Sequence, residues 1–110
     1  MPAYVIYEDE LLIGILNIEP DRNGHILLIP KEHYADFIDI PDELVLHINR
    51  IMKASTPEIM AALGSESIAW RFNYGTSQTV KHFHVHGVPN ILLETEEIKP
   101  LEEVYHLLKK

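Results

Sequence analysis

Short apolar runs alternate with polar turns in the N-terminal part of the chain. Residues 5–7, 11–18 and 25–29 are rich in aliphatic and β-branched side chains, a pattern typical of strands. Residues 19–24, between the second and third runs, are dense in turn-forming residues. The pattern therefore predicts three strands joined as an antiparallel hairpin or meander, the third of which ends at Pro30.

The middle of the chain shows a different spacing, in which apolar residues recur at helical intervals. Asp42 is the candidate N-cap of this helix, and Gly64 is the expected stop. Pro57 lies inside the segment and is expected to kink the helix or split it in two, because proline lacks an N–H and its ring clashes with the preceding turn. The apolar positions that set the helical period are Leu44, Ile48, Ile51, Met52, Ile59, Met60 and Leu63.

Two further strands and a terminal helix complete the predicted fold. Residues 67–73 and 81–88 predict strands separated by a loop at 74–78, and residues 100–110 predict a short C-terminal helix. This order predicts one α+β domain over residues 1–110, with an antiparallel five-stranded sheet and one main helix. Since the helix covers one face of the sheet, the other face stays available for a ligand.

Composition excludes several classes of function. The 110-residue chain has 46% hydrophobic residues, which fits one domain. It has no cysteine, which rules out disulfides, thiolate zinc sites and a cysteine nucleophile, and which fits a reducing cytoplasm. The first residues lack the features of a signal peptide, and no apolar stretch is long enough to span a membrane. A net charge of -8 argues against a nucleic-acid partner.

Histidines occupy alternate positions in the last predicted strand. Because side chains alternate faces along a strand, His82, His84 and His86 are expected on one face, and Phe83 and Val85 on the other. The apolar pair can then face the helix while the imidazoles line the open face. Three imidazoles in a row are unusual on the open face of a half-buried strand, so this face is the candidate site.

Imidazole can serve near neutral pH as a nucleophile, an acid or a hydrogen-bond donor, because its ordinary pKa is about 6.5. Phosphoryl transfer needs a nucleophile, an acid for the leaving oxygen and donors for the remaining phosphate oxygens. The histidine row can supply the first two, and Ser77, Gln78 and Thr79 immediately before it can supply donors. Phosphate or nucleotide chemistry is therefore the first interpretation of the row.

Two other interpretations stay open on these grounds. Neutral imidazoles are common metal ligands, and two neighbours in the row can share one ion. A closed metal site would then need Asp9, Glu19 or His25 brought close by the fold. In the plainest interpretation, the histidines are merely tolerated on a solvated face.

The segment that carries the histidines resembles a known family. Residues 78–86 read Gln-Thr-Val-Lys-His-Phe-His-Val-His and closely resemble the signature of the histidine-triad (HIT) superfamily. Residues 7–10, 17–20 and 24–33 resemble the family's central hairpin, the last of them reading Gly-His-Ile-Leu-Leu-Ile-Pro-Lys-Glu-His. Asn73-x-Gly75 resembles the start of its phosphate loop. The likeness covers most of the chain, in the family's order.

The resemblance implies a nucleotidyl hydrolase or transferase that acts on a nucleoside phosphate. His84 would attack the α-phosphate and form a nucleotidyl-histidine intermediate, which water then cleaves. The carbonyl of His82 would accept a hydrogen bond from His84 and fix its tautomer, and His86 would help the leaving group depart. No metal is required for the attack, and the substrate can arrive as a metal–nucleotide complex.

The resemblance also implies the residues that bind the substrate. Gln78 and Thr79 would hold phosphate oxygens, with Ser77 in the same loop and Asn73 beside it.

On the nucleoside side, Asn17 would contact the ribose hydroxyls, Ile18 would pack on the base, and His25 would support the site. Asparagine at position 17, together with residues 78–81, favours the branch of the family that cleaves dinucleoside polyphosphates over the branch that cleaves nucleoside phosphoramidates.

The implied partners are a nucleotide, such as AMP or a dinucleoside polyphosphate, and a second copy of the chain. The homodimer would form through residues 42–64 and 67–73.

The chain departs from the family pattern in four respects. It lacks the zinc-binding cysteine pair found in some members, and its phosphate loop is about two residues short. Ser77 stands where glycine is usual, and Asn90 stands where arginine is frequent. Because serine resists backbone conformations that glycine adopts, a nucleotide sensor or adaptor with little turnover is an alternative function.

Overall fold

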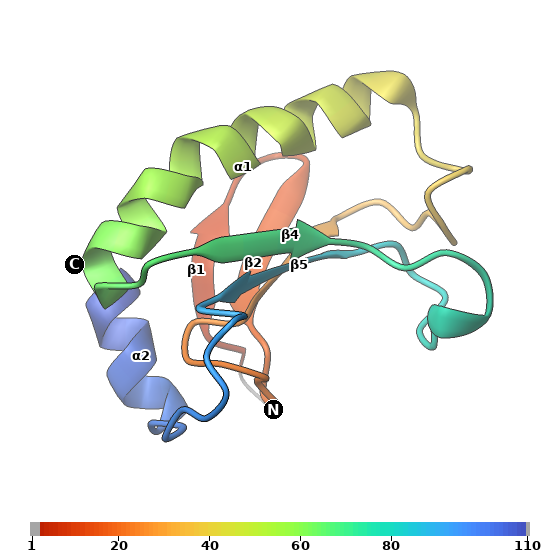
Figure 1. Cartoon of the computed structure of the whole chain (residues 1–110). Coiled ribbons are helices and arrows are strands. Elements are labelled where there is room, and N and C mark those ends of the chain that lie inside the picture. The colour runs from red at the N-terminus through yellow and green to blue at the C-terminus, as the bar shows by residue number, and fades with distance from the viewer. Residues whose placement is uncertain (1–2, 110) are drawn as a thin grey trace.

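The computed structural model describes residues 3–109, which form an antiparallel sheet covered on one face by a long helix (Figure 1). The five strands lie in the order β1-β2-β3-β5-β4, and every neighbouring pair is antiparallel. The predicted α+β fold with a five-stranded sheet is therefore confirmed. Its elements are β1 (Val5–Glu8), β2 (Leu12–Leu16), β3 (Ile26–Pro30), α1 (Asp42–Leu63), β4 (Ile68–Arg71), β5 (Val85–Pro89) and α2 (Leu101–Leu108).

The β2–β3 hairpin forms the centre of the sheet because its side chains alternate between a buried and a half-buried face. Both strands show the same alternation, and Leu12 pairs with Pro30 while Leu16 pairs with Ile26. The buried side chains of the two strands pack against the inward face of α1, where Leu44, Ile48 and Ile59 are buried. This packing leaves the opposite face of the sheet free of helices.

Helix α1 is one unbroken element, so the predicted single main helix is confirmed and, of the two expected effects of Pro57, the split into two helices does not occur. The turn before the proline gains side-chain hydrogen bonds, since the hydroxyls of Ser55 and Thr56 donate to the carbonyls of Ile51 and Met52, each at 2.7 Å. The helix curves over the sheet (Figure 1).

The ends of α1 follow the sequence in part. Gly64 ends the helix in a left-handed conformation with φ of 63°, as predicted. Asp42 is the first residue of the helix instead of its N-cap, which is Pro41. The predicted N-cap is therefore wrong, although an acidic residue in the first turn still interacts favourably with the helix dipole.

The last strand is shorter than predicted. The sequence predicts residues 81–88 as a strand, but β5 begins at Val85. The preceding segment bonds to the chain that follows β3 instead of joining the ladder, since the N–H of Phe83 donates to the carbonyl of Tyr34 at 2.7 Å. Phe83 and Val85 are nevertheless buried, and the three histidines between and around them are half-buried, so the alternation of faces survives.

The terminal helix is confirmed as α2, which packs against the C-terminal part of α1 and buries Val104. Lys110, which the prediction included in this helix, lies outside the described residues. No helix within residues 3–109 combines the length and apolarity needed to cross a membrane.

Candidate active site

One hydrogen bond fixes the tautomer of the neutral His84 ring. Its Nδ1 atom lies 2.8 Å from the carbonyl oxygen of His82. A carbonyl can only accept a hydrogen bond, so the Nδ1 atom carries the proton. In the neutral ring the Nε2 atom then holds an unshared electron pair. This is the state that a nucleophilic imidazole requires.

His86 has the opposite tautomer, and a chain of hydrogen bonds fixes it. The backbone N–H of Asp21 donates to Nδ1 of His25 at 3.1 Å, which places the proton of His25 on its Nε2 atom. That Nε2 atom lies 2.9 Å from Nδ1 of His86 and donates to it. The proton of neutral His86 is therefore on Nε2, available to a ligand on the open face.

Both members of this pair stay neutral at neutral pH. Burial, followed by the charges of His84, His25 and Arg71, lowers the pKa of His86 to about 4, against a small opposing effect of Asp21. Burial also lowers the pKa of His25. The rings of His84 and His86 are 4.9 Å apart between centroids, so an electron-pair donor and an N–H donor stand side by side.

His82 positions His84. Its Nε2 atom donates to the carbonyl of Pro30 at 3.0 Å, at the end of β3, and its Nδ1 atom faces Nδ1 of His33 at 3.3 Å. Because the first bond leaves Nδ1 of His82 unprotonated, His33 is the donor of the second. With its ring held in this way, the backbone carbonyl of His82 is fixed beneath His84.

Asn17 and Ile18 lie at the end of β2, next to the histidine pair. The Nδ2 atom of Asn17 is 3.5 Å from Nε2 of His25, and its Oδ1 atom accepts from the N–H of Glu19 at 3.0 Å. The side chain of Ile18 is 57% exposed and thus free to contact a ligand. The fold therefore brings Asn17, His25 and His86, distant in sequence, into one contiguous row.

The loop before the histidines is arranged differently. Residues Gly75–Ser77 form a short 3₁₀ turn, after which Gln78 is buried. Its Nε2 atom donates to the carbonyls of Ala35 and Val80 at 2.7 and 3.0 Å, and its Oε1 atom is buried without a partner in the described part of the chain. Gln78 thus ties the loop to the segment after β3.

The other candidate phosphate-binding side chains of this region are more accessible to solvent than Gln78. The side chains of Ser77 and Thr79 are exposed and that of Asn73 is half-buried. Among residues 3–109, no hydrogen bond joins these side chains to the histidines. Within the same residues, no three carboxylates or imidazoles are placed to hold a metal ion together.

The histidine geometry agrees with the comparison of the sequence with known families. Residues 1–91 match the model of the HIT domain. The chain belongs to the HIT family.

Relatives and solved structures agree with this assignment. An uncharacterised HIT-like protein of Methanocaldococcus jannaschii is 35% identical over 90% of this chain and 78% of its own length. The adenosine 5′-monophosphoramidase of Schizosaccharomyces pombe is 31% identical over 94% of this chain and 86% of its own. A zinc-bound HIT family protein of Mycobacterium smegmatis superposes with a TM-score of 0.87, at 36% identity, over 99% of this chain and 83% of that one. The family thus includes an enzyme that acts on a nucleotide.

Two charged residues beside the HIT histidines did not stand out in the sequence. The sequence predicts only a turn at Asp21, yet its N–H sets the tautomer of His25. Arg71 belongs to β4, pairs in register with His86, and lies 3.5 Å from the carboxylate of Asp21. Its alternation with Trp70, which is typical of a core-facing residue, was the available sign that Arg71 faces the histidines.

Proposed function

We propose that this protein is a nucleotidyl hydrolase or transferase that cleaves a nucleoside phosphate derivative at its α-phosphate, with His84 as the nucleophile. The observation that carries the proposal is the pair of opposite tautomers at His84 and His86. One ring offers an electron pair, and its neighbour offers an N–H to the leaving group. Membership of the HIT family supports the same chemistry.

In the first step, the electron pair on Nε2 of His84 forms a bond to the α-phosphorus, and the bond from phosphorus to the leaving group breaks. The carbonyl of His82, which accepts the hydrogen bond from Nδ1–H, stabilises the positive charge that develops on the ring. His86 donates a hydrogen bond to the departing atom, where negative charge collects.

In the second step, water attacks the phosphorus of the nucleotidyl-histidine. The bond between phosphorus and Nε2 breaks, the electron pair returns to His84, and a nucleoside monophosphate and a proton leave. Attack and hydrolysis use no metal in this proposal, and the nucleotide enters either free or as its metal complex.

The state of His86 favours substrates with an anionic leaving group. A neutral imidazole that gave up its only N–H proton would become an imidazolate, so His86 is a hydrogen-bond donor and a poor source of a whole proton. A nucleoside polyphosphate can depart as an anion without a proton, whereas an amine departing from a phosphoramidate must gain one. We therefore propose dinucleoside polyphosphates as the preferred substrates.

Binding of the nucleoside falls to the end of β2 in this proposal. Asn17 contacts the ribose hydroxyls, the exposed side chain of Ile18 packs on the base, and His25 acts through His86. The exposed hydroxyls of Ser77 and Thr79 contact phosphate oxygens, with Asn73 beside them. Gln78 would have to release the carbonyls of Ala35 and Val80 to join them.

The test is a single-turnover incubation with nucleotides radiolabelled at the α-phosphate, followed by acid treatment of the isolated protein. The wild type is expected to carry acid-labile label that disappears with time as the nucleoside monophosphate is released. The His84→Asn variant, which keeps a hydrogen-bonding side chain but lacks the nucleophile, is expected to bind AMP and carry no label. Turnover by this variant at the wild-type rate would overturn the mechanism.

A nucleotide sensor with little turnover is the second candidate, because Gln78 points into the protein and the loop before the histidines is short. Tight AMP binding without product release from any substrate in the same assay would favour it.

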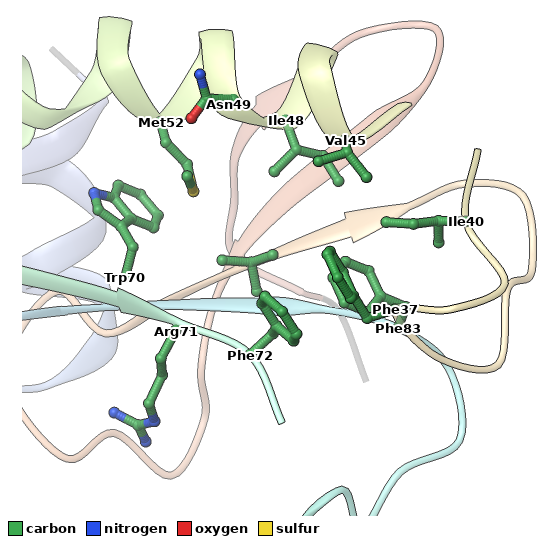
Figure 2. A pocket seen from close by; sticks show the side chains of 11 residues that line it. Phe37, Ile40, Val45, Ile48, Asn49, Met52, Trp70, Arg71, Phe72 and Phe83 are labelled. Atoms are coloured by element: carbon green, nitrogen blue, oxygen red, sulfur yellow. The ribbon is translucent and has the colours of Figure 1, made fainter. Parts of the chain in front are cut away.

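We also propose that the active form is a homodimer. An apolar groove of about 170 Å³ runs between α1 and β4 (Figure 2). It adjoins the free edge of β4, where backbone groups have no strand partner within the described sheet. A second copy would cover both features at once. Side chains that line the groove include Phe37, Val45, Met52, Trp70, Phe72 and Phe83.

Sedimentation velocity tests the assembly. The wild type is expected to sediment as a dimer, and Phe72→Asp, which places a charge on a side chain that is 40% exposed at the groove, is expected to sediment as a monomer. A monomeric wild type at the concentrations used for catalysis would contradict the proposal.

The cytoplasm is the location we propose, since a chain without cysteine gains nothing from an oxidising compartment.

A further inference from the structure

Arg71 faces the histidines because of the side chain that precedes it. Trp70 points toward α1, where its Nε1 atom donates to Thr56 at 2.9 Å. Neighbouring side chains on a strand point to opposite faces, so Arg71 must project from the other face of the sheet. Figure 2 shows the two side chains on opposite sides of β4, with Arg71 directed away from α1.

The strand register places Arg71 directly beside His86. The two residues are paired across β4 and β5, and side chains at such positions have Cβ atoms about 4.5–5.5 Å apart. The charge of Arg71 contributes to the low pKa of both His86 and His25. The guanidinium therefore acts on the part of the site that meets the leaving group.

Most of the guanidinium is uncommitted. Within residues 3–109, its one hydrogen-bonded contact is from Nη2 to the carboxylate of Asp21, at 3.5 Å. The two side chains are 43% and 53% exposed. An ion pair that is this long and this exposed to solvent contributes little to the stability of the protein. A guanidinium has five N–H donors in a planar fork that matches two oxygens of a phosphate.

A cation at this position also changes how an anion meets the protein. The chain has a net charge of -8, which disfavours the approach of a polyanion in general. A local positive charge would favour binding of the distal phosphates of a polyphosphate, and position 90, immediately after β5, holds the uncharged Asn90.

We propose that Arg71 is a specificity-determining residue that binds the anionic leaving group beside His86, exchanging Asp21 for phosphate oxygens. This inference rests on the proposed function and names the substrate class of the same site. Asp21 has two roles here: its N–H fixes His25, and its carboxylate is a weakly bound partner of Arg71 that an anion can replace. Substrates with an uncharged leaving group gain nothing from the arginine.

The test compares kcat/KM for a dinucleoside polyphosphate and for a nucleoside phosphoramidate with an uncharged amine, in the wild type and in Arg71→Gln. The polyphosphate value is expected to fall roughly 10- to 100-fold, the range for a lost charge-assisted hydrogen bond. The phosphoramidate value is expected to change less than about threefold, since it makes no such bond. In Arg71→Lys, which keeps the positive charge, kcat/KM for the polyphosphate should fall less than in Arg71→Gln.

The matched control is Arg50→Gln, which removes the same charge from an exposed position on α1, the helix on the opposite face of the sheet. It is expected to leave the ratio of the two substrates unchanged. The inference would be overturned if Arg71→Gln lowered kcat/KM equally for both substrates. It would also be overturned if Arg50→Gln changed the ratio of the two kcat/KM values as much as Arg71→Gln does.

Failure of the proposed function is distinguishable from failure of the inference. If the wild type turns over neither substrate and forms no labelled intermediate, the proposed function fails. Calorimetric titration with inorganic tripolyphosphate and with AMP then decides the role of Arg71 alone. Weaker tripolyphosphate binding by Arg71→Gln, with AMP binding unchanged, supports the role, and equal effects on the two ligands overturn it.

Discussion

The Nε2 atom of His25 donates a hydrogen bond of 2.9 Å to Nδ1 of His86, and this contact decides which nitrogen of His86 faces the ligand. His25 is itself fixed, because it is only 3% exposed and accepts a hydrogen bond from the backbone of Asp21. The buried ring of His25 and the half-buried ring of His86 thus connect the β2–β3 turn to the open face of the sheet. A residue that touches no substrate thereby sets the chemistry of one that does.

Replacing His25 should therefore impair catalysis without removing a substrate contact. In His25→Leu, His86 loses its fixed tautomer, and kcat is expected to fall roughly 3- to 10-fold, as for one neutral hydrogen bond. In His25→Gln, the side-chain amide can still donate to His86, so most of the activity should return. NMR of the imidazole nitrogens checks the cause: the tautomers of His86 should be mixed in the leucine variant only. A single unchanged tautomer in both variants would contradict this account.

The lowered pKa of His86 should also make stability depend on pH. The pKa of His86 is about 4 in the folded chain and about 6.5 when unfolded, so the unfolded state binds more protons between these values. The stabilisation is fully present above about pH 6.5, and the free energy of unfolding should decrease as the pH falls from there to about 4. Urea titrations across this range measure the slope.

The variant His86→Gln, which cannot titrate, should show a shallower decrease over the same range. Carboxylates such as Asp9 titrate below this window in the folded state and from about pH 4 when unfolded, so they contribute mainly at its lower end. Parallel curves for the variant and the wild type would show that His86 is not held neutral by the fold.

The faces of the histidine row were predictable, and the local structure around it was not. Alternation predicted that Phe83 and Val85 are buried and that the histidines share the other side, and the burial pattern agrees. The strand itself starts late because the N–H of Phe83 bonds to Tyr34, a partner far away in sequence. The alternation of apolar residues predicts which side chains are buried. The hydrogen bonds that define the strand depend on contacts with distant residues, which a local sequence pattern does not contain.

The same limit applies to the supporting residues of the site. The inward position of Gln78 depends on the carbonyl of Ala35, and the position of Arg71 depends on the register between β4 and β5. Neither is encoded in a short motif. Pro57 shows the converse, since a strong local rule predicted a kink or a split and the packing of α1 on the sheet maintains one unbroken helix.

Asp9 is expected to be a major determinant of stability in the β1–β2 turn. Its Oδ1 atom accepts from the N–H groups of Leu11 and Leu12 at 2.7 and 2.8 Å. Its Oδ2 atom accepts from Tyr7 at 2.5 Å and contacts His47 of α1 at 2.7 Å. Burial alone would raise the pKa of Asp9, but these hydrogen bonds outweigh it and hold that pKa well below its usual range. The hydrogen bond also raises the pKa of Tyr7 to about 12.

The variant Asp9→Ala is expected to lose about 1–3 kcal/mol of unfolding free energy in urea, because several exposed or partly buried hydrogen-bond donors lose their acceptor together. The variant Asp9→Asn keeps an oxygen for the two backbone donors, and its loss should be smaller. Activity per folded molecule should not change, because the cluster lies away from the histidines. An alanine variant as stable as the wild type would show that the turn does not depend on the carboxylate.

Gly87 should not tolerate a side chain, because the ring of Trp70 lies directly over it. A Cβ atom at this position would be 2.6 Å from Cζ3 of Trp70, closer than packed carbon atoms allow. Alanine is otherwise the better residue within a strand. Any loss must therefore come from this contact, and Gly87→Ala is expected to destabilise the protein by about 1–3 kcal/mol.

A double-mutant cycle isolates the contact between the two residues. Trp70→Phe alone should be destabilising, since it removes the hydrogen bond to Thr56 and part of the packing against α1. In the background of Trp70→Phe, Gly87→Ala should cost less than in the wild type, because the smaller ring leaves room for the methyl group. Thermal or urea unfolding of the four proteins measures the coupling. Additive losses would mean that Trp70 does not meet the new side chain, and the close packing of β4 on β5 would have to be rejected.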